Sequence, residues 1–144
     1  MKEATLIDGM LADDATLIDH GGKLWMFAGI RDWQASSWEA LGLFSADTLL
    51  GPWQPHAENP VARSRRRATA GALFQHDGAL IRPVQDCRDG YGAGLAFARV
   101  DRLDETGFAQ TILARVTPRA RAIKGLHTYN RAGDIEAIDL FGKF

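Results

Sequence analysis

Three segments of the chain share one pattern of apolar and polar positions. Each begins with an apolar run, passes through a short turn containing glycine, and continues into a second apolar run. The segments are residues 15–27 (ATLIDHGGKLWMF), 72–84 (ALFQHDGALIRPV) and 126–138 (LHTYNRAGDIEAI). Aligned on Gly22, Gly78 and Gly133, they are almost evenly spaced, the second interval being one position shorter than the first. Apolar runs on either side of a glycine turn are typical of a β-hairpin, and a hairpin that recurs at this period predicts the blades of a β-propeller.

The rest of the chain fits this division into blades. We predict one four-stranded blade over residues 13–56, a second over 70–116 and half a blade over 125–142, all within a single domain. Residues 1–14 are predicted as a lead-in, and Arg99–Glu105 as a turn region rather than a helix. Two and a half blades cannot close a ring, so we expect missing blades, a second copy of the chain, or an open wedge.

Composition narrows the class of protein without naming a reaction. The chain has 144 residues, 46% hydrophobic and 24% charged, as in a soluble globular domain. Its net charge of −1 gives no general attraction to nucleic acid. No apolar stretch approaches the roughly 20 residues that span a bilayer, and the acidic N-terminus does not resemble a signal peptide. The single cysteine, Cys87, has no partner for an internal disulfide, so a cytoplasmic protein is expected.

Several segments together resemble known sugar-processing propellers. The blade start Asp14–Phe27 resembles the five-bladed propellers of family 43 and family 32 glycoside hydrolases. A larger set resembles the propeller domain named for glucosamine inositolphosphorylceramide transferases. That set comprises Leu43–Asp47, Gly51–His56, Ala70–Gly71, Phe74–Gly78, Arg82–Cys87, Tyr91–Gly92, Gly125–Asn130 and Ile138–Asp139. The resemblance covers about residues 13–142, and it implies an all-β, partial five-bladed propeller in which the N-terminal blades are missing.

The resemblance also implies where a site would lie. In similar hydrolases, acids at the starts of the inner strands converge on the propeller axis. Asp14 occupies such a position, but its counterparts in the next two repeats are Ala70 and Gly125. A hydrolytic pair of carboxylates is therefore not supplied by the repeat. Asp14 remains the best candidate for a catalytic carboxylate; the other interpretations are an acceptor for a sugar hydroxyl or an aspartate that caps a turn.

Four further residues are candidates for ligand contact. Gln85 and Asp86 precede a glycine-rich loop, where they would either bind sugar hydroxyls or fasten that loop. His127 lies on an inner strand, where a buried core histidine is the alternative. Arg67 ends the basic run Arg63–Arg67, which is either a solvated linker or a phosphate contact. In the family an arginine stands where this chain has Ala68, which leaves Arg67 one place out of register.

The remaining features exclude several classes of enzyme and cofactor but do not identify a reaction. The chain has no glycine-rich phosphate loop and no nucleophile elbow, and no histidine pair stands at metal-ligand spacing, so we expect no cofactor and no metal. Trp33 and Trp38, in a polar loop, are candidates to stack on a sugar ring. The leading hypothesis is a domain that recognises a sugar or sugar-phosphate and is associated with glycosyl or formyl transfer. The alternatives are a glycoside hydrolase completed by other blades or a second subunit, and a degenerate, non-catalytic interaction domain.

Overall fold

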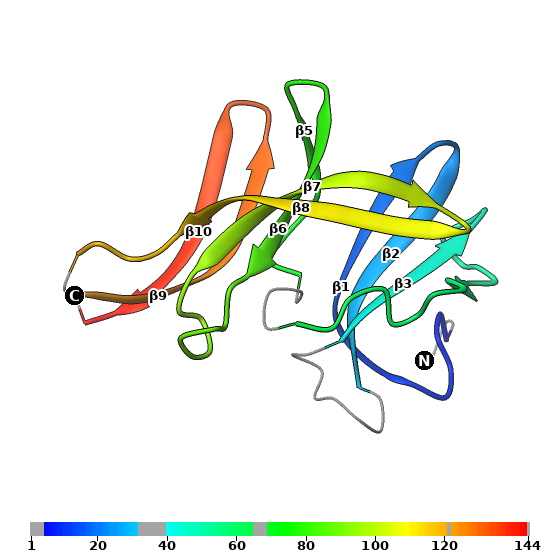
Figure 1. Ribbon diagram of the computed structural model, residues 1–144, viewed down its shortest axis with the longest axis horizontal. Coiled ribbons are helices and arrows are strands. Elements are labelled where there is room, and N and C mark those ends of the chain that lie inside the picture. Colours follow the sequence, from blue (N-terminus) through cyan, green and yellow to red (C-terminus); the bar gives the residue numbers. More distant parts are fainter. Residues whose placement is uncertain (1–4, 32–39, 65–68, 121, 144) are drawn as a thin grey trace.

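The computed structural model describes residues 5–31, 40–64, 69–120 and 122–143. Within these ranges all regular structure is β-strand (Figure 1). The strands are, in chain order, β1 (Leu11–His20), β2 (Lys23–Arg31), β3 (Leu41–Ala46), β4 (Gln54–Pro55), β5 (Phe74–His76), β6 (Ala79–Gln85), β7 (Leu95–Asp104), β8 (Gly107–Val116), β9 (Ile123–Ala132) and β10 (Ile135–Gly142). No helix in the described ranges is long and apolar enough to cross a bilayer.

The strands form three antiparallel sheets, which confirms the predicted all-β class. Their orders are β1-β2-β3-β4, β5-β6-β7-β8 and β9-β10. Each sheet follows the chain without a crossover, as expected for a propeller blade. We call them blade 1, blade 2 and the half blade, and Figure 1 shows them side by side in this order. Two of the three sheets are therefore four-stranded, and the third is a single hairpin.

The hairpin turns set the true period of the repeat. The residues that close the three turns pair as His20–Lys23, His76–Ala79 and Ala132–Ile135, so the three hairpins are equally spaced along the chain. Gly133 is thus the counterpart of Gly21 rather than of Gly22, and the shorter second interval predicted from the glycines is wrong by one residue. Counted from these turns, each residue of β2 corresponds to the residue of β6 that lies equally far from its own turn.

The structure corrects two predicted boundaries. Strand β1 begins at Leu11, inside the predicted lead-in. Strand β7 continues to Asp104, so most of the predicted turn region around Arg99–Glu105 is strand. Arg99, Asp101 and Arg102 are exposed on this strand, and the Arg99 guanidinium donates to the Asp101 carboxylate at 2.6 Å. A register shift between Val100 and Arg102 brings Val100 and Leu103 to one face, where both pack against blade 1. This tertiary contact extends the strand beyond what local sequence indicates.

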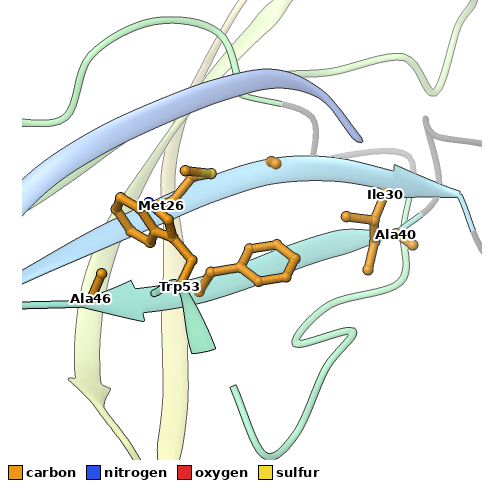
Figure 2. Packing of buried hydrophobic residues seen from close by; sticks show 7 residues of the cluster. Met26, Ile30, Ala40, Ala46 and Trp53 are labelled. Atoms are coloured by element: carbon orange, nitrogen blue, oxygen red, sulfur yellow. The ribbon is translucent and has the colours of Figure 1, made fainter. Parts of the chain in front are cut away.

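Apolar cores lie between the blades and on the outer side of blade 1. Strand β2 alternates, so that Trp25 and Phe27 face blade 2 while Met26 and Ile30 face the opposite side. On that opposite side they pack with Trp53 and other buried residues, as Figure 2 shows. A second interface joins blade 2 to the half blade through residues that include Ala70, Leu95, Leu126 and Tyr129. Packing between blades therefore supplies most of the core.

Strand β9 of the half blade closely approaches two backbone segments beside blade 2, the segment before β5 and the loop between β6 and β7. The Tyr129 amide donates to the Ala70 carbonyl at 2.7 Å, and the Leu126 amide donates to the Gly92 carbonyl at 2.9 Å. At Gly71, with a φ of 128°, an added Cβ would overlap the Tyr129 carbonyl. Gly125 is equally crowded, by Phe141 and the Gly92 carbonyl. Glycine at these positions lets the blades meet at the axis.

Candidate functional site

Asp14 lies on β1, beside the segment that leads into blade 2. It sits in β1 at a β-bulge, since the pairing register with β2 shifts between Asp13 and Thr16. Its φ of 49° lies in the left-handed region, which is strained for most residues but tolerated better by Asp and Asn. The Thr69 hydroxyl donates a hydrogen bond to the Asp14 carbonyl. Because β-bulges and strained backbone recur at functional sites, this geometry supports Asp14 as a candidate.

His127 is the centre of a polar cluster on the neighbouring inner strand, β9. Its Nε2 lies 3.3 Å from the Gln85 amide nitrogen and is also hydrogen-bonded to the Tyr91 hydroxyl. Its Nδ1 lies 3.9 Å from the Asp139 carboxylate of β10. Because the Gln85 nitrogen can only donate, Nε2 is an acceptor, and the neutral ring carries its proton on Nδ1 facing Asp139.

Gln85 positions the cluster rather than presenting a free group. The residue is only 2% exposed. Its amide nitrogen lies 3.4 Å from the Thr69 carbonyl, and its amide oxygen lies 3.8 Å from the Cys87 thiol, which donates to it. Since Thr69 also bonds Asp14, one short hydrogen-bonded chain joins the two inner-strand candidates. The structure therefore brings Asp14, Gln85 and His127 together.

Electrostatic interactions tie Tyr91 to the same site. Burial raises the pKa of the Tyr91 phenol, and the charges of nearby carboxylates, Asp14 first among them, raise it further. The phenol thus stays protonated at neutral pH and acts as a hydrogen-bond donor rather than a nucleophile. Its side chain is 53% exposed. Sequence reasoning did not select Tyr91, although an aromatic residue between Gly90 and Gly92 in a loop was a usable signal.

Asp14 is itself electrostatically perturbed. Partial burial raises the pKa of its carboxyl, and the neighbouring charge of Asp13 raises it further, while His127 opposes both. The site thus combines carboxylates, a phenol and an imidazole, which are groups that exchange hydrogen bonds with hydroxyls. Across the described ranges, no group of His, Cys, Asp and Glu is arranged to hold a metal ion.

Asp86 lies apart from this cluster. Of the two roles that the sequence allowed, contact with a sugar or attachment of the glycine-rich loop, the structure supports the second. Its carboxylate is fully buried, and it bonds Arg88 at 3.0 Å and Arg115 at 2.8 Å. Its amide donates to the Gly94 carbonyl at 2.8 Å. Arg115 also reaches Asp89 at 2.6 Å. Asp86 therefore fastens the loop between β6 and β7, and its carboxylate is not presented to a ligand.

Three other candidates fall in segments that are not described. Arg67, Trp33 and Trp38 all lie outside the described residues. Their predicted roles, a phosphate contact for Arg67 and sugar stacking for the two tryptophans, stay predictions.

Comparison with known proteins identifies the family. The profile described as "Glucosamine inositolphosphorylceramide transferase 1, N-terminal" matches residues 2–137 of the chain. The chain belongs to this family. Its match to glucosamine inositolphosphorylceramide transferase 1 of Oryza sativa subsp. japonica is 32% identical over 112 residues, covering 75% of the chain and 15% of the relative. The relative from Arabidopsis thaliana is 26% identical over 121 residues, covering 81% and 16%. The chain thus spans about a sixth of each curated relative.

A solved structure supports the fold of this family member. A thermostable family-43 glycoside hydrolase superimposes with a TM-score of 0.51 at 18% identity, covering 78% of the chain and 40% of the hydrolase. At this identity the likeness concerns the fold alone. It shows that the two blades and the half blade resemble part of a propeller of the family-43 type.

The raised pKa of Asp14 predicts a pH-dependent effect of Asp14→Asn. The folded state favours the protonated carboxyl of Asp14, because its folded pKa is raised. Ionisation therefore lowers the stability of the fold as the pH rises, and this cost is fully present above the folded pKa. Below the unfolded pKa of about 3.9 the carboxyl is protonated in both states, so the cost is absent. Solvent screens this partly exposed group, so the effect is small. We expect Asp14→Asn to be more stable than the parent at pH 7 by about 0.5 kcal/mol, with no gain near pH 3.

Thermal denaturation across this pH range measures the effect of Asp14→Asn. Asp77→Asn is the matched control, because Asp77 has the same φ of 49° and is 91% exposed in its side chain. A loss of stability on Asp14→Asn at pH 7 would contradict the expectation.

Proposed function

We propose that this domain binds a sugar or sugar-phosphate at the axis, in a protein that carries out glycosyl or formyl transfer. The observation that carries the proposal is the convergence of Asp14, Tyr91 and His127. They come from three separate segments, and all three lie at least partly open to solvent. Membership of a family whose description names a transferase supports the association with group transfer. A propeller concentrates such groups where its inner strands meet.

The chemistry of these groups suits a hydroxyl-rich ligand. The Asp14 carboxylate accepts hydrogen bonds from hydroxyls, and so does the Tyr91 oxygen, whose own proton is donated to His127 Nε2. The exposed Tyr91 ring adds an apolar face against which a sugar ring packs. Tyr91 is held by its bond to His127 and by a ring contact with it at 5.2 Å. Any phosphate contact would fall to Arg67, although the resemblance places the family's arginine one position later, where this chain has Ala68.

The full architecture that we propose is a five-bladed ring. The likeness to the family-43 hydrolase supports blades of this type. Blades that the described residues do not contain would close the ring around the Asp14 site. A closed ring would also shield the site from water, which strengthens hydrogen bonds to a sugar.

Calorimetric titration of the chain with glucosamine, N-acetylglucosamine and inositol 1-phosphate tests the proposal. We expect saturable binding of at least one of these probes. Tyr91→Phe should weaken it by about 1 kcal/mol through loss of the hydroxyl, and Tyr91→Ala should weaken it further through loss of the ring. Asp14→Asn should weaken it while Asp77→Asn leaves it unchanged.

The alternative functions give different results in the same experiments. Absence of binding to every probe would favour the interaction-domain hypothesis. Release of nitrophenol from nitrophenyl glycosides, abolished by Asp14→Asn, would favour the hydrolase. Binding without turnover supports the recognition domain.

A further inference from the structure

The aromatic ring of Phe141 lies beside the candidate site. Phe141 is near the end of β10 and pairs with Gly125 of β9. A Cβ added at Gly125 would overlap the edge of the Phe141 ring, so the ring occupies the space that a side chain at this position would fill. Glycine at residue 125 thus lets an aromatic ring lie directly on the backbone of β9.

The same ring reaches the loop between β6 and β7, which carries Tyr91. A Cβ added at Gly92 would lie 3.0 Å from Phe141 Cε1. The loop is held against β9 at this point, because the Gly92 carbonyl accepts a hydrogen bond from the Leu126 amide at 2.9 Å. The Phe141 ring is therefore turned across β9 towards blade 2, and away from the free edge of β10.

Strand geometry places this ring next to the polar cluster around His127. Phe141 follows Asp139 by two positions on β10, and alternate residues of a strand project from the same face of its sheet. The Asp139 carboxylate lies 3.9 Å from His127 Nδ1. The face of β10 that carries Phe141 is thus the face that borders the candidate site.

Packing within the domain does not explain why this position carries an aromatic ring. Phe141 is 47% exposed, and none of the apolar cores formed by the described residues includes it. Glycine backbone lies under one side of the ring, so the other side is the part that is open to solvent. An exposed aromatic face beside hydrogen-bonding groups suits a ligand that carries both C–H and O–H groups.

We propose that the Phe141 ring is a stacking surface for a pyranose, whose hydroxyls bond Asp14 and Tyr91. The inference rests on the proposed function and narrows its ligand to a cyclic sugar with mainly equatorial hydroxyls. In such a sugar the axial C–H bonds point to the two faces of the ring, while the hydroxyls lie at its rim. The C–H bonds carry a slight positive charge, which the negative face of an aromatic ring attracts.

Calorimetric titration with a cyclic sugar and an open-chain analogue tests this assignment. The cyclic probes are glucosamine and N-acetylglucosamine, and the open-chain probe is glucosaminitol, which has the amino group of glucosamine but no ring. We expect Phe141→Ala to weaken the binding of the cyclic probes roughly tenfold and to change the binding of glucosaminitol less. Phe141→Trp should retain the binding of the cyclic probes, because it keeps an aromatic face.

Two further variants control for effects on the fold. Ile135→Ala removes a large apolar side chain that is 74% exposed at the other end of β10, and it should leave binding unchanged. Phe141→Leu keeps an apolar side chain over Gly125 but has no aromatic face, so binding should fall in this variant as well. Thermal denaturation of each variant shows whether it is folded.

A nuclear magnetic resonance measurement reports the contact directly. In a sample with labelled phenylalanine rings, the signal that is missing from Phe141→Leu belongs to Phe141. We expect this signal to shift when glucosamine or N-acetylglucosamine is added to the parent.

The possible results separate this inference from the proposed function. Full affinity of Phe141→Ala for the cyclic probes, or a Phe141 signal that does not move as they bind, would overturn the inference and leave the proposed function intact. Binding of inositol 1-phosphate alone would also overturn only the inference. Absence of binding to every probe would contradict the proposed function and the stacking role together.

Discussion

Replacing Asp86 with asparagine should destabilise the domain by about 3 kcal/mol, which corresponds to a fall in melting temperature of roughly 10 °C. The Asp86 carboxylate is fully buried and is bonded by both Arg88 and Arg115. An amide cannot satisfy two guanidinium groups as the carboxylate does. The loop between β6 and β7, which presents Tyr91 to the site, should loosen as well. Chemical denaturation measures the loss, and hydrogen exchange over residues 87–94 locates it.

Asp89→Asn is the matched control for this change. Asp89 shares Arg115 with Asp86, but its side chain is 69% exposed, and exposed ion pairs contribute little. We expect a loss below about 1 kcal/mol. Equal, small losses for the two variants would contradict the structural role of Asp86. In that case, its predicted role as a ligand contact would regain support.

Gly71→Ala is expected to detach the half blade from blade 2. The new Cβ would overlap the Tyr129 carbonyl, and the φ of 128° is unfavourable for any side chain. Overpacking and backbone strain together should cost about 3–5 kcal/mol. The inner strands would have to separate, with loss of the bond between Tyr129 and Ala70. Hydrogen exchange should therefore accelerate most over residues 123–142.

Gly78→Ala separates the two contributions to that cost. Gly78 has a φ of 75°, but an added Cβ there would meet no atom within 4 Å. Only backbone strain remains, worth about 1–2 kcal/mol. If Gly71→Ala cost no more than Gly78→Ala, the close approach of the two blades at the axis would be contradicted.

These two predictions bear on the site because contacts between blades build it. Asp14 reaches His127 through Thr69, which bridges to Val84 of blade 2, and through Gln85 of blade 2. A variant that separates the blades should weaken ligand binding even though it replaces no ligand-binding group. Binding measurements should therefore be accompanied by a stability measurement for every variant.

The sequence predicted the strands well because each hairpin carries its own signal. Alternating apolar residues and glycine turns act over a few positions, so the hairpin predicted over residues 72–84 forms as β5 and β6. Strand β7 was cut short, because Val100 and Leu103 are fixed by blade 1, which is distant in sequence. The one-residue error at Gly133 has a related origin, since glycine fits either turn position and only strand pairing distinguishes them.

The candidate site was predictable only in part. Asp14, Gln85 and His127 were selected from their places on inner strands and in a distinctive segment, and the structure brings them together. Nothing local separated Asp86 from Gln85, although one is buried between two arginines and the other supports His127. Tyr91 and Asp139 join the site from a loop and a second strand.

The sequence by itself determined the all-β class, the repeat and the hairpins, because hydrophobic periodicity and turn chemistry are local properties. Only the tertiary structure decided which polar residues share a site, which carboxylate is buried in ion pairs, and which sheet edge stays open. Those outcomes depend on how blades that are distant in sequence pack against one another. Contacts between blades do not produce a recognisable hydrophobic pattern within a single segment, so local sequence does not predict them.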